Sequence, residues 1–202
     1  DMNTGMKVET KRLILLPGVN ERDAPPFLKM LEKDGNFREF CGVDLSERNL
    51  KRFATYFERT GHEECIYSIF LKNINVFVGY VGFHREEDGD YEIEFYVSKE
   101  YRRNGYCEEA CKVVMKQIFH EGISVDGEIL SVDKLYAVTM IENEPTIRLL
   151  EKLGFRRENF ENGTDWLMQT VIGEEDDSFY INTIIKMKIE KIQYMQLNKD
   201  FK

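Results

Sequence analysis

Two glutamates, Glu92 and Glu94, alternate with apolar residues in the stretch YEIEFYV at residues 91–97. Because side chains repeat with a period of two along a strand, both carboxylates are expected on one face, together with the ring of Tyr96. A carboxylate placed in this way can take a proton from an ammonium substrate, directly or through a water molecule. One or both glutamates could instead lie on a solvated face of the sheet, and the sequence leaves this alternative open.

A basic, glycine-centred turn follows this strand and opens a helix. Residues 102–107 read RRNGYC, and apolar residues recur with helical spacing through residues 106–119. The start of a helix has unpaired N–H groups and a positive partial charge that together bind anions, and Gly105 permits a close backbone approach. Arg102 and Arg103 add positive charge. The pattern predicts a diphosphate site, and the alternative is a basic surface turn in which the glycine serves only as a bend.

A second polar helix start follows later in the chain. The strand expected at residues 130–140 is separated by a helix from the strand at 91–97, so the two are expected to be parallel neighbours. Both helix starts then fall at the carboxyl ends of these strands, where open α/β sheets bind ligands. Asn143 can hydrogen-bond an amide-rich ligand there, and Thr146 offers a hydroxyl group. The alternative is that Asn143 caps the helix and Thr146 is an ordinary first-turn residue.

Composition and motif content exclude several functions. The chain has 202 residues, 42% of them hydrophobic, and a formal net charge of −9, which argues against a nucleic-acid partner and weakly favours a cationic one. The basic turn lacks the lysine and hydroxyl of a P-loop and the three glycines of a dinucleotide-binding fingerprint. No apolar run reaches the roughly 18 to 20 residues of a membrane span, and the chain does not start with an apolar signal core. We therefore expect no membrane partner and a cytoplasmic location.

The cysteines and histidines do not suggest a metal site. The four cysteines form no C-x-x-C pair and are expected to be reduced thiols. Cys107 and Cys111 are four residues apart on the expected helix and could face one metal ion, but no histidine stands at ligand spacing. No metal is therefore expected.

The order of the elements predicts one domain with a mixed sheet. Three strands joined by short turns, at residues 65–71, 76–84 and 91–97, predict an antiparallel meander. The other strands are expected at 7–16, 130–140, 155–160, 165–171 and 179–189, and the helices at 24–33, 50–60, 106–120, 143–155 and 192–197. The aromatic residues of the tail could form a homodimer surface or cover their own sheet, of which the second is favoured: Trp166, Phe179, Tyr180 and Tyr194.

Three segments in this order resemble the GNAT superfamily of acyl-CoA-dependent N-acetyltransferases. They are ETKRLILL at residues 9–16, EIEFYV and RRNGYC within 92–107, and NEPTIRLLEKLGF at 143–155. The opening E-T-x-R-L-x-L and the pattern N-x-x-[ST]-x-x-x-x-E-K-x-G-F resemble the Rim-type branch, related to acetyltransferases of ribosomal-protein N-termini. The resemblance covers roughly residues 7–189. It implies one domain at 6–189 with a C-terminal extension at 190–202.

The fold that this resemblance implies is α/β (α+β), a mixed and mostly antiparallel sheet of about six to seven strands. Helices flank the sheet, and one parallel pair of strands lies at the cofactor cleft. The resemblance also implies acetyl-CoA as cosubstrate, with Arg102 at the first position of the motif R/Q-x-x-G-x-G/A, Gly105 at its first glycine and Cys107 at its final small position. Cofactor-binding residues are implied in the strand backbone, the turn and the second helix start: Phe95, Tyr96, Val97, Arg102, Arg103, Asn104, Gly105, Tyr106, Cys107 and Asn143. Glu92 fits the base position of the family better than Glu94, and both are catalytic candidates.

Two positions depart from the family pattern. Cys107 replaces the usual glycine or alanine, although its side chain is still small. Leu150 stands where many relatives carry a tyrosine that is thought to protonate the departing thiolate. Rim-type relatives have Ser or Thr at the position of Thr146, so Thr146 or a water molecule is the expected substitute.

The expected function is acetyl transfer from acetyl-CoA to a primary amine, either a protein N-terminus or a small amine, by direct attack on the thioester. The missing tyrosine keeps open a catalytically weak acyl-CoA-binding sensor or scaffold, and a third interpretation is an enzyme that uses a longer acyl group. Residues 17–62 and 156–202 are expected to frame the acceptor pocket, but neither contains a motif that names the acceptor.

Overall fold

The structure is a computed structural model that describes residues 7–17, 24–41, 44–53, 55, 65–86, 88–125, 127–172 and 179–199. Its strands are β1 Val8–Glu9, β2 Leu13–Pro17, β3 Cys65–Leu71, β4 Val76–Arg85, β5 Tyr91–Val97, β6 Ile123–Val125, β7 Glu128–Leu130, β8 Lys134–Met140, β9 Arg156–Glu158, β10 Leu167–Ile172 and β11 Phe179–Glu190. Its helices are α1 Ala24–Asp34, α2 Phe37–Cys41, α4 Tyr106–Glu121, α5 Glu144–Lys152 and α6 Lys191–Leu197, with a short 3-10 helix at Lys99–Tyr101. Residues 47–53 are also helical, and residues 56–60 of the expected helix at 50–60 lie outside the described residues.

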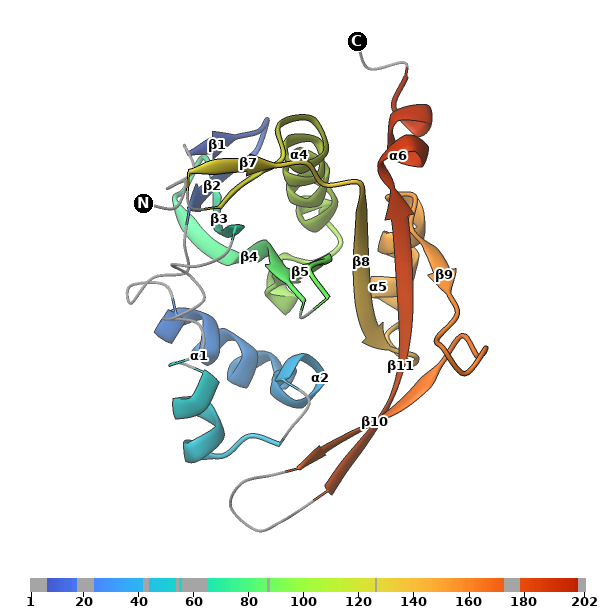
Figure 1. The fold of residues 1–202 in the computed structure, drawn as a ribbon. Helices are drawn as coiled ribbons and strands as arrows, with labels where there is room; N and C mark the ends of the chain where they lie inside the picture. Colours follow the sequence, from blue (N-terminus) through green and yellow to red (C-terminus); the bar gives the residue numbers. More distant parts are fainter. Residues whose placement is uncertain are drawn as a thin grey trace.

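A mixed sheet forms the centre of the fold (Figure 1). Its strand order is β1-β2-β3-β4-β5-β8-β11-β10, with β9 paired to β11, so nine strands are described where about six to seven were expected. Strands β5 and β8 are parallel, and the other described pairs are antiparallel. The predicted fold class, including the meander β3-β4-β5 and the parallel pair, is confirmed.

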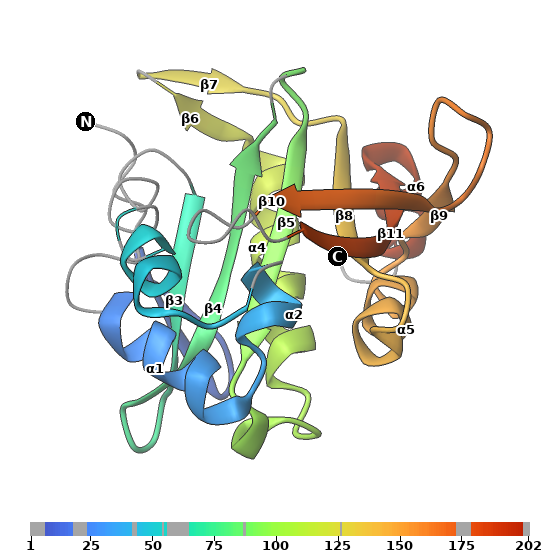
Figure 2. The ribbon, with the colours of Figure 1, turned by 90° about the horizontal axis from the view of Figure 1, so that it is seen from below.

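Helices cover both faces of the sheet (Figure 2). On one face, α1 and α2 bury Phe27 against Tyr80 and Tyr96, with ring centroids 4.9 and 5.7 Å away. On the other face, α4, α5 and α6 share the larger core, in which Tyr194 of α6 stacks on Phe119 of α4 at 4.7 Å. The central strands of the sheet are therefore packed between helices, and this packing fixes the strands that carry the site.

Two expected strands are wrong in their bounds. The strand expected at 7–16 is broken, because Thr10 N donates to Leu13 O at 3.0 Å and Leu13 N donates to Thr10 Oγ1 at 2.9 Å, which closes a turn. The strand expected at 130–140 begins only at Lys134. Leu130 pairs with Ile123 in the separate hairpin β6-β7, so its backbone belongs to another sheet.

The tail contains both buried and exposed aromatic residues. Tyr194 is buried, and Tyr180 packs against the cluster around Phe27. Trp166 and Phe179 remain 43% and 68% exposed. None of the helices in the described part of the chain is long and apolar enough to cross a membrane.

Candidate active site

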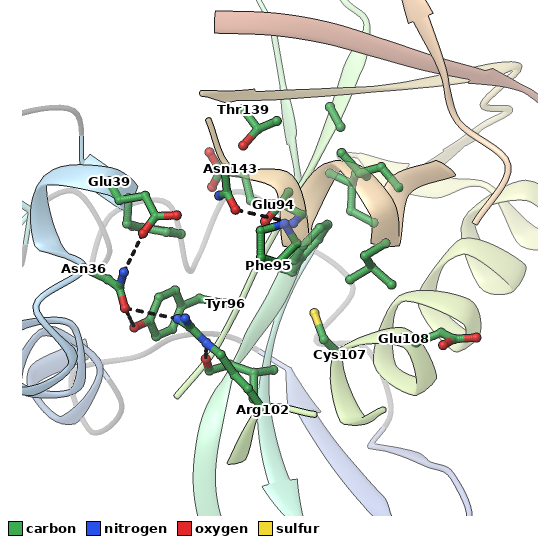
Figure 3. Close-up of a pocket in the computed structure, with 18 of the residues that line it drawn as sticks. Asn36, Glu39, Glu94, Phe95, Tyr96, Arg102, Cys107, Glu108, Thr139 and Asn143 are labelled. Atoms are coloured by element: carbon green, nitrogen blue, oxygen red, sulfur yellow. Dashed lines mark hydrogen bonds between the residues drawn. The ribbon is translucent and has the colours of Figure 1, made fainter. Parts of the chain in front are cut away.

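The parallel strands β5 and β8 pair only near their starts and then separate. Tyr91 is opposite Leu135 and Glu92 is opposite Tyr136, and no later pair is formed between them in the described residues. A cavity of about 950 Å³ lies along the gap, lined by residues 93–97 of β5 and 137–140 of β8 (Figure 3). Among the residues that the structure describes, no strand pairs with the backbone groups on this edge of β5 beyond Glu92, so an extended ligand with amide groups can pair with them.

The start of α4 opens into the same cavity. Gly105 precedes the helix in the left-handed conformation, at φ 75°, and no side chain caps the helix there. The first N–H groups of α4 are therefore free of an intrahelical partner and can bind an anion. Arg103, Gly105, Tyr106 and Cys107 line the cavity beside them. This arrangement has the donor set and the charge that a diphosphate requires.

The guanidinium group of Arg102 already donates hydrogen bonds within the protein. Its Nε donates to the carbonyl of Val97 at 2.9 Å, and its Nη2 donates to Asn36 Oδ1 at 3.2 Å. Its guanidinium carbon also lies 5.2 Å from the ring centroid of Tyr96. The side chain lines the cavity but ties the end of β5 to the segment between α1 and α2 (Figure 3). Its contact with a diphosphate stays a prediction.

Glu92 and Glu94 lie on one face of β5, as predicted, and both line the cavity. They surround His84 of β4, which the antiparallel register places opposite Glu92. Glu92 Oε2 lies 3.6 Å from His84 Nε2, and Glu94 Oε1 lies 3.3 Å from His84 Nδ1. Tyr80 donates its hydroxyl proton to Glu94 Oε2 at 2.8 Å, and Glu86 Oε1 lies 2.6 Å from His84 Nε2.

This arrangement moves the pKa values of the two carboxyl groups apart. Burial raises the pKa of Glu92, and the contact with His84 opposes that rise only in part. Burial acts in the same direction on Glu94, but His84 and the Tyr80 hydroxyl outweigh it and lower the pKa of Glu94. Burial would lower the pKa of His84, whereas Glu92 and Glu94 together raise it to about 11. Near neutral pH the cluster therefore contains an imidazolium beside the Glu94 carboxylate.

The ligand atoms of His84, Glu92 and Glu94 lie within 4.8 Å of one another, close enough for a metal ion. A protonated imidazole is not a metal ligand, because both nitrogens carry hydrogen. Metal binding at this cluster would have to displace that proton. The expectation of no metal stays a prediction.

The second helix start lies across the cavity. Asn143 Oδ1 accepts a hydrogen bond from Thr146 N at 3.4 Å, so Asn143 caps α5, and both residues also line the cavity. Leu150 lies one turn further along α5, is 1% exposed and forms part of the apolar wall. Cys107 Sγ points into the cavity from α4 (Figure 3).

One wall of the cavity is formed by the first of the two segments expected to frame the acceptor pocket. Asn36, Glu39 and Phe40 line the cavity, whereas no described residue of 156–202 does. Tyr96 holds this wall in place, because its hydroxyl donates to Asp34 Oδ2 at 2.6 Å. That residues 156–202 help to frame an acceptor pocket stays a prediction.

Sequence reasoning missed His84 and Tyr80 because each is a single residue in an apolar strand. The turn length between β4 and β5 fixes the hairpin register, which could have placed His84 opposite Glu92. Asp34 and Asn36 gave no comparable signal, because they approach β5 only through the packing of α1.

The comparisons with known proteins define the class of the chain as an acetyltransferase. Residues 12–156 match the family described as the acetyltransferase (GNAT) domain. The chain belongs to this family, as the sequence resemblance predicted.

Relatives of known name agree with this assignment. The chain is 24% identical over 171 residues to the uncharacterized N-acetyltransferase YnaD of Bacillus subtilis, covering 80% of this chain and 92% of YnaD. A GNAT-family acetyltransferase structure from Bacillus anthracis has a TM-score of 0.66 at 20% identity, covering 93% and 99% of the two chains. The ribosomal-protein-S5-alanine acetyltransferase of Vibrio fischeri has a TM-score of 0.64 at 13% identity, covering 94% and 99%. These two structures share the fold.

Proposed function

We propose that the protein is an acetyl-CoA-dependent N-acetyltransferase that acetylates a primary amine by direct attack on the thioester. The observation that carries this proposal is the single cavity that joins the uncapped start of α4, the unpaired edge of β5 and the carboxylates of Glu92 and Glu94. Bound acetyl-CoA supplies the activated acyl group. The start of α4 suits its diphosphate, and the edge of β5 suits its amide-bearing arm.

Side chains of the protein carry out the proton transfers of the reaction. An amine attacks only as the neutral base, so Glu92 or Glu94 accepts a proton from the ammonium group. Thr146 or a water molecule supplies a proton to the departing thiolate, since Leu150 cannot do so. In this proposal the catalytic domain is residues 6–189, residues 190–202 are a C-terminal extension, and the enzyme acts in the cytoplasm.

The acceptor is a peptide N-terminus or a small amine. The test measures thiol release from acetyl-CoA with peptides that begin with alanine or serine, with spermidine and with kanamycin. We expect turnover with at least one acceptor, and loss of it in Glu92→Gln. We also expect Arg103→Glu to weaken acetyl-CoA binding measured by calorimetry. Absence of thiol release with every acceptor would contradict the proposed activity.

The apolar Leu150 favours a second candidate, a catalytically weak acyl-CoA-binding sensor of the same fold. Tight acetyl-CoA binding without turnover across the acceptor panel would support it. Faster thiol release from a longer acyl thioester would instead identify another acyl group as the substrate.

A further inference from the structure

We infer that His84 and Glu86 form a proton exit that carries the proton taken up by Glu92 out of the active site. This inference rests on the proposed function and assigns Glu92, rather than Glu94, as the base. An ammonium acceptor and acetyl-CoA give an amide, free coenzyme A and one proton. The N–C bond forms, the C–S bond breaks, and the ammonium loses two protons. One of them ends on the thiol, so the other must reach the solvent in each turnover.

The three side chains form a line that runs from the cavity to the surface. Glu92 lines the cavity, whereas His84 and Glu86 do not. Glu92 Oε2 and Glu86 Oε1 both face His84 Nε2, at 3.6 and 2.6 Å. The exposed fractions of the side chains are 14% for Glu92, 15% for His84 and 43% for Glu86. A proton can therefore leave through His84 and Glu86, which lie outside the cavity lining, while cofactor and acceptor occupy the cavity.

Glu94 is not suited to be the entrance of this path. Its Oε2 accepts a hydrogen bond from the Tyr80 hydroxyl at 2.8 Å, and its Oε1 lies at an ion-pair distance of 3.3 Å from His84 Nδ1. Both partners stabilise its ionised form, which makes it a poor proton acceptor. Glu94 instead keeps the imidazolium in position from the side opposite Glu86.

The transfer balances in two steps. When Glu92 takes the substrate proton, one of the negative charges beside the imidazolium is neutralised, so the imidazolium proton is held less tightly. His84 Nε2 then passes its proton to Glu86, and Nε2 takes the proton from Glu92. In the described residues, the charged groups that face His84 are Glu86 on the turn after β4 and Glu92 and Glu94 on β5. Glu92 and His84 return to their initial states, and the proton leaves from the exposed Glu86.

Glu86→Gln removes the exit and keeps the shape of the side chain. The experiment measures kcat and KM for the best acceptor of the panel, at low and at high concentration of imidazole buffer and in H2O and D2O. We expect kcat of Glu86→Gln to fall about a hundredfold at low buffer, the low end of general acid–base effects, with KM unchanged. High buffer should restore kcat, because a small base can carry the proton instead, and the solvent isotope effect on kcat should rise. Glu121→Gln, an exposed glutamate at the end of α4, is the matched control and should behave as the wild type.

Two results would overturn the exit. One is a kcat of Glu86→Gln equal to that of the wild type at low buffer, and the other is a reduced kcat that imidazole does not restore. NMR titration of the His84 ring gives an independent readout, with His84→Gln used for its assignment. A neutral ring at pH 7 would contradict the path even if acetyl transfer is confirmed. Lack of turnover by the wild type would count against the proposed function itself, which separates the two failures.

Discussion

Arg12, in the turn between β1 and β2, donates from Nη1 to the backbone carbonyl of Asn104 at 2.7 Å. Its Nε donates to Glu109 of α4, also at 2.7 Å, and the Thr10 hydroxyl donates to the same carboxylate at 2.6 Å. The guanidinium lies 4.7 Å from the ring centroid of Tyr106. Thr10 and Arg12 belong to the opening E-T-x-R-L pattern, so this pattern supports the turn before α4 from the far end of the chain.

Arg12→Ala should weaken binding of coenzyme A although Arg12 does not line the cavity. Loss of the two charge-assisted hydrogen bonds releases the Asn104 carbonyl and the first turn of α4, and it should cost about 1–2 kcal/mol of binding free energy, roughly a tenfold higher Kd. Calorimetry with coenzyme A measures this change. Lys11→Ala, at the exposed neighbouring position, is the control. Equal Kd values for Arg12→Ala and the wild type would show that the turn holds its shape without this support.

Cys107 offers a direct test of where the cofactor binds. Its thiol faces the cavity, whereas Cys111, one turn later on α4, is fully buried. Iodoacetamide should alkylate Cys107 in the free protein, and saturating acetyl-CoA, which has no free thiol to consume the reagent, should slow that reaction by at least about tenfold, because a bound ligand leaves only a small open fraction. Mass spectrometry of the peptide follows the modification, with Cys111 as an internal control. Alkylation of Cys107 at the same rate with and without acetyl-CoA would place the ligand elsewhere.

Because of His84, the stability of the folded protein should fall as the pH rises above about 6.5. Its pKa is raised from 6.5 to about 11 in the folded state, so the imidazolium stabilises the fold fully below about pH 6.5. This contribution is lost as the pH rises toward 11. His84→Gln leaves carboxylates without their cation and should destabilise the protein by on the order of 3 kcal/mol at pH 7. Urea unfolding at several pH values should show the difference from the wild type shrinking between pH 7 and 10, and His120→Gln should leave the pH dependence intact.

Much of the site could be predicted from sequence patterns, because each of its parts is formed by residues that are close together in the chain. The alternation of 91–97, the RRNGYC turn and the N-E-P-T helix start each depend on neighbours in the chain, and the structure shows strand, turn and helix at these positions. The separation of β5 from β8 and the capture of Arg102 by Asn36 depend on packing between distant segments. No periodicity in the sequence encodes the contact between distant segments, so these two features could be seen only in the structure.

Tyr96→Phe should separate acceptor binding from cofactor binding. The Tyr96 hydroxyl donates to Asp34, and its removal leaves the carboxylate with backbone donation from Lys99 N at 2.8 Å. Loss of this bond should cost about 1 kcal/mol of stability and loosen the wall formed by α1 and α2. We expect KM for the acceptor to rise several-fold while the Kd for coenzyme A changes little. Tyr67→Phe, which removes a hydroxyl contact with Gln117 at a residue that does not line the cavity, provides the control, and equal effects of Tyr96→Phe on both ligands would contradict this division of the cavity.

Thr146 is the residue of α5 that can replace the missing tyrosine acid. It lines the cavity in the first turn of α5, and its backbone N–H is already used in the cap with Asn143, so its hydroxyl is the group left for the thiolate. Thr146→Ala should lower kcat by about tenfold or more if the hydroxyl gives the proton, and Thr146→Ser should retain most of it. Thermal unfolding of both variants distinguishes loss of chemistry from loss of the fold. If Thr146→Ala keeps wild-type kcat, a water molecule is the acid.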